Sequence, residues 1–399
     1  MSPVIAPSDV STQGEGALLC IGGRAIYADG KHLVLADAYR QITLAVGQNP
    51  IPASPGDLLV VTVRVARGQL ELLYVQSHQA CPEPTQNSEF GLRGMTERGG
   101  YLRARSRAKR AIHQYFEAQN FVEVDTPSAV PSPGLDAHVS SWSAIPCKER
   151  SLFLVTSPEF HMKRLLSAGM PRIYQIGHCY RSEEHGPWHE PEFTMLEWYR
   201  AFATWEDTMA DTEALLRAAA EVIAGDEIQQ LLEEPFERVS VADAFAMFGG
   251  TRSALDLAES DELRYFEILV NAVEPALARY PRPVFLTHYP LSQSGLAQAC
   301  PENERCAQRY ELYFRGLELC NGFSELTDAV AQRQRFELEL LRREKTGEPA
   351  YPIDERFLAA LAEGVPASSG NALGFDRLVA ALLQVEELKA VSSFTDQER

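Results

Sequence analysis

The chain has 399 residues, of which 45% are hydrophobic and 23% are charged, and this length allows two domains with sizeable cores. Its 37 lysines and arginines against 55 aspartates and glutamates give a formal net charge of −18. This charge argues against broad contact with a nucleic-acid backbone and leaves a local basic patch open. Seven cysteines without a CxxC pair indicate reduced thiols and no zinc site. Without a signal peptide or a run of about 18 apolar residues, a cytoplasmic protein with no membrane contact is expected.

The first 80 residues predict a polar tail and a small β domain. Residues 1–14 are polar, so a disordered tail is expected there. Between residues 15 and 80, short apolar runs alternate with turn signals such as Asp29-Gly30. The number and length of these runs are typical of a small closed barrel, and an OB-like β-barrel is the type that we expect. A barrel that only packs or docks a partner is an equal alternative to one that reads nucleic acid. The expected strands are 18–26, 32–37, 41–46, 58–66 and 70–75.

The remaining residues predict a linker and a larger domain. Residues 81–98 lack periodicity and are expected to form the linker, which leaves residues 99–399 for the larger domain. An apolar stripe predicts a helix over 101–119, and a strand that ends at Pro127 follows it. Residues 205–275 are mostly helical in pattern, which predicts an insertion packed on the core.

Two expected strands, 172–181 and 192–199, enclose a stretch dense in charged and aromatic side chains. Phe193, Glu197 and Tyr199 alternate along the second strand and therefore share one face. An unpaired carboxylate is costly to bury, so Glu197 predicts a pocket floor that receives a cation. Arg181 ends the first strand, where its planar guanidinium can hold a carboxylate or a phosphate. A surface hairpin with solvated charges is the alternative.

Other segments also carry candidate chemistry. Ser157 is a good N-cap, and Glu159 follows near the positive end of a helix, where it either caps the helix or meets a ligand. Glu311 and Glu318 flank an apolar strand and turn. Two carboxylates suit Mg²⁺ bound together with nucleotide phosphates, although two solvated glutamates would give the same pattern. Arg377 follows a glycine-rich turn whose backbone can approach a ligand, and a helix over 378–388 is expected after it.

Several motifs resemble those of class II aminoacyl-tRNA synthetases, in particular the lysyl branch. The strand pair resembles motif 2 through the runs YRSE, HEPEFT and EWY within residues 180–199. The helix and strand over 101–127 resemble motif 1, and SGNALGFDRL at 369–378 resembles motif 3. The run ELCNGFSELTD at 318–328 is similar to a specific signature of the lysyl enzymes. MLEWY at 195–199 is most similar to the elongation factor P (R)-β-lysine ligases, which are paralogues of lysyl-tRNA synthetase.

The resemblance covers residues 99–399 and implies an α+β catalytic domain in which an antiparallel sheet is flanked by helices. It implies a homodimer formed through motif 1. The implied enzyme is an AMP-forming ligase that uses ATP and Mg²⁺ to activate lysine or β-lysine as an aminoacyl-adenylate. Elongation factor P is the expected acceptor, through a lysine side chain, and tRNA is the less expected one. A lysyl-tRNA synthetase and an inactive module that senses lysine or docks a partner remain as alternatives.

The resemblance also implies roles for individual residues. Arg181 and Arg377 would be catalytic, because they would hold the phosphates of ATP. The substrate would be bound by Ser157, Pro158, Glu159, Glu197, Tyr199, Asn321, Glu325 and Ala372. ATP would be bound by Arg181, Ser182, Glu183, His189, Glu190, Phe193, Glu318, Leu319, Gly374 and Arg377. Magnesium would be bound by Glu311 and Glu318.

The sequence departs from the family pattern at a few of these positions. Ala372 stands where the tRNA ligases usually carry glycine, which favours the elongation factor P branch. Glu190 and Ser182 stand where the family has asparagines near ATP, and a carboxylate at residue 190 would repel phosphates. The expected N-terminal barrel is unusual for the elongation factor P ligases and points toward the tRNA enzymes.

Overall fold

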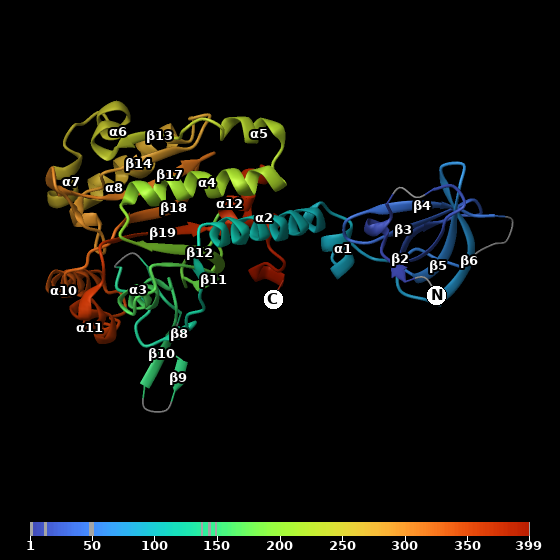
Figure 1. Ribbon diagram of the computed structural model, residues 1–399, viewed down its shortest axis with the longest axis horizontal. Coiled ribbons are helices and arrows are strands. Elements are labelled where there is room, and N and C mark those ends of the chain that lie inside the picture. The colour runs from blue at the N-terminus through green and yellow to red at the C-terminus, as the bar shows by residue number, and fades with distance from the viewer. Residues whose placement is uncertain are drawn as a thin grey trace. The chain divides into compact units, whose positions relative to one another are not determined.

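The computed structural model describes residues 3–11, 14–47, 52–136, 139–142, 145–147 and 150–398 (Figure 1). The chain divides into two compact units, residues 1–104 and 105–399. The division falls within helix α2 (Arg98–Ala118), a few residues after the predicted boundary. No helix among the described residues combines the length and the hydropathy that a membrane span requires.

The first unit is built on a ring of strands. Strands β2, β3, β4, β6 and β5 pair in that order, and β2 also pairs with β5, which closes the ring. Alternate residues of β5, namely Leu59, Val61 and Val63, point into the core. The sequence therefore predicted the five ring strands with small errors at their ends, since β6 extends beyond residue 75. The bounds are β2 (Leu18–Ala28), β3 (His32–Ala36), β4 (Gln41–Ala45), β5 (Leu58–Ala66) and β6 (Gln69–Gln79).

Two predictions about the segments that flank this ring were wrong within the described residues. In the expected tail, β1 (Val4–Ile5) pairs with β2 in parallel, and a 3₁₀ turn, η1 (Pro7–Asp9), follows it. In the expected linker, α1 (Glu89–Gly94) forms because the Ser88 side chain accepts the Gly91 N–H and caps the helix. Backbone pairing in the first case and a local cap in the second supply order that composition did not reveal.

An eight-stranded sheet forms the centre of the second unit. Its order is β13-β14-β17-β18-β19-β12-β11-β7, antiparallel from β14 to β11 and parallel at both ends. The sheet is flanked by helices, as the sequence predicted. The bounds are β7 (Val122–Glu123), β11 (Arg172–Tyr180), β12 (Glu192–Ala201), β13 (Glu237–Ser240), β14 (Val284–Thr287), β17 (Arg309–Phe314), β18 (Leu317–Ser324) and β19 (Ser368–Gly374).

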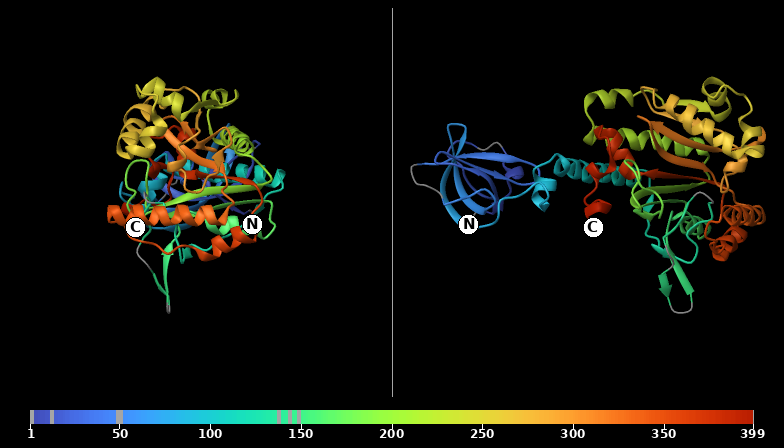
Figure 2. Two further views of the ribbon diagram at one scale, coloured as in Figure 1. Left: turned by 90° about the vertical axis from the view of Figure 1, so that its left-hand side faces the viewer. Right: turned by 180° about the vertical axis from the view of Figure 1, so that it is seen from behind.

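The two faces of this sheet are covered by different helices (Figure 2). On one face, α4 (Trp205–Ile223) is joined to β19 by a hydrogen bond from Asn371 to Thr212. On the other face, an apolar cluster joins Tyr199 of β12 to three helices, α3 (Glu159–Ser167), α10 (Ala329–Thr346) and α11 (Glu355–Gly364). Helix α12 (Phe375–Leu383) ends five residues before the predicted residue 388, because Gln384 adopts a left-handed conformation with φ of 57°.

The predicted helical insertion over 205–275 also contributes a strand to the sheet. Besides its helices it contains β13, which pairs with β14 at the edge. The other helices there are α5 (Asp226–Leu231), α6 (Val241–Phe248), α7 (Ala254–Ser260), α8 (Glu262–Ile268), π-helical η2 (Leu269–Val273) and α9 (Glu274–Leu277). Short elements elsewhere are β8 (Ala129–Val130), β9 (Ile145–Cys147), β10 (Arg150–Leu154), η3 (Leu291–Gln293), β15 (Ala299–Cys300), β16 (Asn303–Ala307), η4 (Leu388–Val391) and η5 (Asp396–Glu398).

We expect Gly99→Ala and Gly100→Ala, two neighbouring substitutions in α2, to shift stability in opposite directions. Each removes a helical glycine, which by itself favours the folded state by about 0.5–1 kcal/mol. A Cβ at Gly100 meets no atom of the described residues within 4 Å, whereas a Cβ at Gly99 would overlap the backbone oxygen of Ala38. In calorimetry of the full chain, Gly100→Ala should raise the melting temperature and Gly99→Ala should lower it. Equal shifts would contradict this packing of α2.

Candidate active site

A row of side chains crosses the middle of the main sheet. The register aligns Glu197 on β12 with Ala372 on β19, Ala372 with Asn321 on β18, and Asn321 with Glu311 on β17. Directly opposed residues on neighbouring strands point to the same face. The four residues therefore lie side by side on the face that α3 covers.

A second row lies two residues along the same strands and faces the same way. It contains Tyr199, Gly370, Phe323 and Arg309. Gly370 is required there because a Cβ would overlap the Tyr199 ring and the Glu325 carboxylate. The absence of a side chain on β19 thus makes room for the tyrosine beside Glu197.

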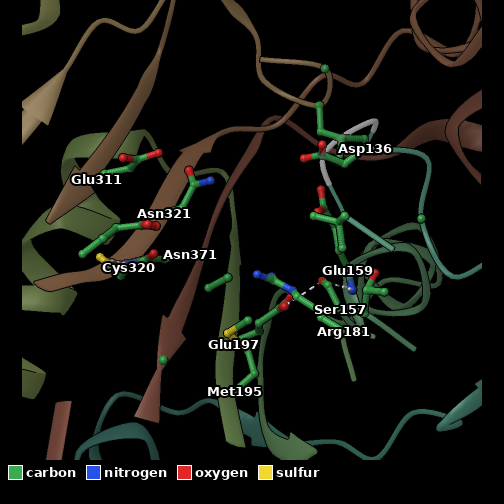
Figure 3. A pocket seen from close by; sticks show the side chains of 18 of the residues that line it. Asp136, Ser157, Glu159, Arg181, Met195, Glu197, Glu311, Cys320, Asn321 and Asn371 are labelled. Atoms are coloured by element: carbon green, nitrogen blue, oxygen red, sulfur yellow. Dashed lines mark hydrogen bonds between the residues drawn. The ribbon is translucent and has the colours of Figure 1, made fainter. Parts of the chain in front are cut away.

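A cavity of about 500 Å³ opens over these rows (Figure 3). The predicted Pro158, Ser182, Glu183 and Glu325 are not among the residues that line it. Ser182 hydrogen-bonds to the Ser140 backbone oxygen instead, through both its N–H and its side chain. The predicted residues that do line the cavity are Ser157, Glu159, Arg181, His189, Glu190, Phe193, Glu197, Tyr199, Glu311, Glu318, Leu319, Asn321, Ala372, Gly374 and Arg377.

Glu197 forms the floor of the acidic end of the cavity and is fully buried. Ser157 Oγ donates to Glu197 Oε1 at 2.7 Å, and the Tyr199 hydroxyl donates to Oε2 at 3.0 Å. Burial, followed by the nearby Glu159 carboxylate, raises the pKa of Glu197 to about 7. Near neutral pH this carboxyl is therefore poised to lose its proton when a cation arrives. Ser157 is one residue before the N-cap of α3, which is Pro158, so its hydroxyl serves Glu197 as well as the Glu159 N–H.

Lys163 belongs to the same end and was missed by the sequence analysis. Its ammonium donates to Glu159 Oε1 at 2.6 Å and forms an ion pair with Glu325. The Glu159–Lys163 spacing of four residues on one helix could have suggested the first contact. Glu325 directly follows β18 and is distant in the chain, so no local pattern indicated the second contact.

Arg181 forms a site for anions beside the acidic end. Its guanidinium carbon lies 5.1 Å from the centroid of the Phe193 ring, and Nη1 donates to Glu184 at 3.1 Å. The Nε group is buried and has no hydrogen-bond partner among the described residues. An unsatisfied buried donor of this kind is costly, and an oxygen of a carboxylate or phosphate would satisfy it.

Arg377 lies at the start of α12 and also faces the cavity. It donates to the backbone oxygens of Trp188 at 3.2 Å and Glu318 at 3.0 Å, and its Nη2 lies 2.7 Å from His189 Nε2. Burial, followed by the Arg377 charge, lowers the pKa of His189. The imidazole is therefore neutral and can accept from Arg377. Glu190, which stands where the family has an asparagine, accepts the Asp396 N–H at 3.4 Å. This carboxylate therefore has a partner in the C-terminal segment.

Glu311 and Glu318 differ in how much of each carboxylate is available to a metal. Glu311 accepts from the hydroxyls of Tyr289 at 2.5 Å and Tyr313 at 2.8 Å and from Arg309 at 2.5 Å. Since a carboxylate has about four lone-pair sites, these three hydrogen bonds leave one site of Glu311 for a metal. Glu318 keeps 41% of its side chain accessible, although the protein atoms around it, followed by Glu311, raise its pKa to about 7.

Arg309, Tyr289 and Tyr313 were not predicted as site residues. Arg309 also donates to Asn321 Oδ1 at 3.1 Å, so it holds two neighbours of the central row in place. No cluster of three or more His, Cys, Asp or Glu side chains suited to a metal is present in the described part of the chain. A magnesium ion here would therefore need oxygens from a ligand, which agrees with its preference for phosphates.

The sequence was compared with protein families and with individual known proteins. The family model for class II tRNA synthetases (D, K and N) matches residues 95–398. Elongation factor P–(R)-β-lysine ligases of Hamiltonella defensa subsp. Acyrthosiphon pisum and Edwardsiella ictaluri are each 40% identical, over 296 and 297 residues. The ligase of Haemophilus influenzae is 41% identical over 307 residues. Each alignment covers 71% of this chain and 91% of the relative.

Gly370→Ala should destabilise the chain and disturb the cavity floor. The new methyl would displace the buried Tyr199 ring or Glu325, and overpacking of this kind costs about 1–3 kcal/mol. Gly295→Ala is a matched control, because Gly295 also lies at the cavity and a Cβ there meets no atom within 4 Å in the described part of the chain. Urea denaturation of both variants measures the difference. A Gly370→Ala chain as stable as the control would show that Tyr199 does not need this space.

Proposed function

We propose a function for this chain, which belongs to the family of class II tRNA synthetases of the D, K and N type. It activates lysine or β-lysine with ATP as an aminoacyl-adenylate and transfers the acyl group to a lysine side chain of elongation factor P. The observation that carries this proposal is one cavity in which the carboxylates of Glu159 and Glu197 adjoin Arg181. The relatives named as elongation factor P (R)-β-lysine ligases support the acceptor.

A diamino acid matches the charges of this cavity. One amine would bind Glu159, and the second would bind Glu197 together with the Tyr199 hydroxyl, which already contacts that carboxylate. The substrate carboxylate would meet Asn321 and the unsatisfied Nε of Arg181. Ala372 lies between Glu197 and Asn321 in the sheet, so its methyl would contact the backbone of the substrate and bear on the choice of isomer.

Activation requires positioning and charge neutralisation more than proton transfer. A substrate carboxylate oxygen attacks the α-phosphorus of ATP, and the bond from that phosphorus to the bridging oxygen breaks and releases pyrophosphate. Arg181 would hold both reacting groups, because its fork matches planar oxyanions. Phe193, whose ring contacts Arg181, would stack on the adenine. Arg377 would exchange one of its present contacts for the γ-phosphate.

Magnesium would neutralise phosphate charge when it is bound with ATP. Glu318 fits this role because its carboxylate is accessible, and Glu311 would contribute its one remaining lone pair. In the transfer step, the acceptor amine attacks the acyl carbon, AMP leaves, and the amine loses a proton as the amide forms.

The N-terminal unit bears on the choice of acceptor. We propose that its closed five-strand ring is an OB-type barrel. Residues 15–80 contain five lysines and arginines and five aspartates and glutamates, so the ring carries no formal charge. A neutral ring is poorly suited to a phosphate backbone, which supports a protein partner over tRNA. The family resemblance also supports a homodimer through the motif 1 elements α2 and β7.

A competition between acceptors tests the proposed function. The full chain is incubated with ATP, Mg²⁺ and labelled lysine or (R)-β-lysine, with elongation factor P and tRNA in the same mixture. Label should enter the protein through an amide that survives mild base, whereas an ester to tRNA would hydrolyse. An elongation factor P whose acceptor lysine is replaced by arginine should remain unlabelled.

Other results of this competition, and of a separate assay of exchange between pyrophosphate and ATP, support the alternatives. Label in tRNA, with none in elongation factor P, would support a lysyl-tRNA synthetase. Failure of lysine and β-lysine to promote exchange between pyrophosphate and ATP would support a module that binds without catalysis. Exchange with an uncharged amino acid at an equal rate would contradict the assignment of the acidic end to amines.

The affinity for the amine substrate should rise with pH. Glu197 binds an ammonium in its ionised form, and its pKa in the free chain is about 7. A proton must therefore leave below that pH, so the KM for lysine should fall about tenfold between about pH 6 and about pH 8. Pyrophosphate exchange at saturating ATP measures this KM. In Glu197→Gln the same pH change should leave the KM for lysine nearly constant, and an unchanged slope in that variant would assign the proton to another group.

A further inference from the structure

A lysine of the protein itself lies beside the acidic end of the cavity, behind Glu159, although neither Lys163 nor Glu325 lines the cavity. Lys163 is on α3, one turn after Glu159, and none of its side chain is exposed. Its ammonium donates to Glu159 Oε1 at 2.6 Å and pairs with Glu325, which is 2% exposed. The ammonium also lies 5.3 Å from the centroid of the Phe323 ring and 5.8 Å from that of Phe357. The side chains around it therefore shield this charge from solvent.

The ammonium changes the charge that a ligand meets. We define the amine pocket as Glu159, Glu197, Glu325 and Lys163. Three carboxylates and one ammonium give it a formal charge of −2 when all are ionised. A diamino acid brings two ammonium groups to this pocket, while its carboxylate goes to Arg181. The charges of pocket and ligand are then equal and opposite, which a pocket without Lys163 would not achieve.

Stability alone does not explain a buried lysine at this place. Burial works against the charged form, but Glu159 and Glu325 outweigh it and raise the pKa of Lys163. The surrounding cluster is apolar and includes Phe160, Phe336 and Phe357. In such surroundings an apolar pair of similar volume often serves stability as well as an ion pair or better. A charged pair retained here therefore points to a role in the electrostatics of the pocket.

We propose that Lys163 determines specificity by setting the charge of the amine pocket: it neutralises Glu325 and holds Glu159, so that the pocket accepts amino acids with two amines. This inference rests on the proposed function and deepens it. Lys163 is a positioning residue, since the substrate does not touch it. Glu325 acts through its charge and through Lys163, and Glu159 and Glu197 receive the substrate amines.

Compensating substitutions test the proposal. Glu325→Gln leaves the pocket with a formal charge of −1, and the preference for lysine over its uncharged analogue norleucine should fall about tenfold. Adding Lys163→Met returns the charge to −2, so the double variant should regain the wild-type preference to within about threefold. Dissociation constants from calorimetric titration of the full chain supply the preference without reliance on turnover.

A surface pair provides the matched control. Arg333 and Glu355 form an ion pair between α10 and α11 with both side chains exposed. Arg333→Met with Glu355→Gln should leave the preference unchanged. Lys163→Met alone should lower the melting temperature, because it leaves Glu325 buried without its partner, and the double variant should recover that loss.

The remaining outcomes decide against one claim or the other. A double variant that discriminates no better than Glu325→Gln would overturn the charge-setting role, whatever its stability. Lysine that binds the wild-type chain without promoting pyrophosphate exchange would refute the proposed function. The preference for lysine over norleucine in the variants would still test the role of Lys163. If neither lysine nor β-lysine binds the wild-type chain, both claims fail.

Discussion

The lateral register of β12, β19, β18 and β17 is the constraint on which the rest of the second unit depends. It places Glu197, Ala372, Asn321 and Glu311 in one row under the cavity. A shift of one residue in any of these strands would turn its member of the row toward α4. On the opposite face of the sheet, Trp198 and Tyr310 are fully buried, so such a shift would also remove these side chains from the core. The same pairing that fills the core on one side therefore arranges the polar side chains on the other.

The two ends of the cavity carry charges of opposite sign. At the acidic end, burial and then the nearby Glu159 carboxylate raise the pKa of Glu197, and the ammonium of Lys163 pairs with Glu159 and Glu325. At the other end, Arg181 and Arg377 face the cavity, and one buried nitrogen of Arg181 lacks a partner among the residues that the structure describes. Charges of both signs are thus incompletely satisfied until a ligand with two amines and an anionic group is bound. The cavity is preorganised for such a ligand, which limits the reorganisation that binding requires.

Arg309 holds the residues around the site in place. It contacts Glu311, Asn321 and the backbone of Gln293, and its guanidinium carbon lies 4.5 Å from the centroid of the Tyr289 ring. These contacts link β17, β18 and the wall of the cavity. Together with the two tyrosines they leave Glu311 little freedom, whereas Glu318 remains accessible. The two glutamates of the expected metal site are therefore not equivalent.

The sequence by itself determined the local elements and the chemical types at the site. Alternation in 192–199 identified the face that carries Glu197 and Tyr199, and turn signals located the strands of the N-terminal ring. Most of the site residues that the motifs implied line the cavity, because they lie in short runs whose strand or turn conformation is set locally. Polarity and the absence of periodicity did not predict β1 and α1, where pairing with β2 and the Ser88 cap supply the order.

Only the tertiary structure decided which residues meet across the sheet. The ion pair of Lys163 with Glu325 joins segments far apart in the chain, and no periodicity in either segment records the partner. The contact of Arg309 with the Gln293 backbone also joins two different elements. The same holds for the space beside Tyr199, which depends on a glycine in β19. Burial and pKa follow from these long-range neighbours, since the charge state of a carboxylate depends on what encloses it. The chain sequence specifies the side chains, and the register of the strands specifies which of them share an electrostatic environment.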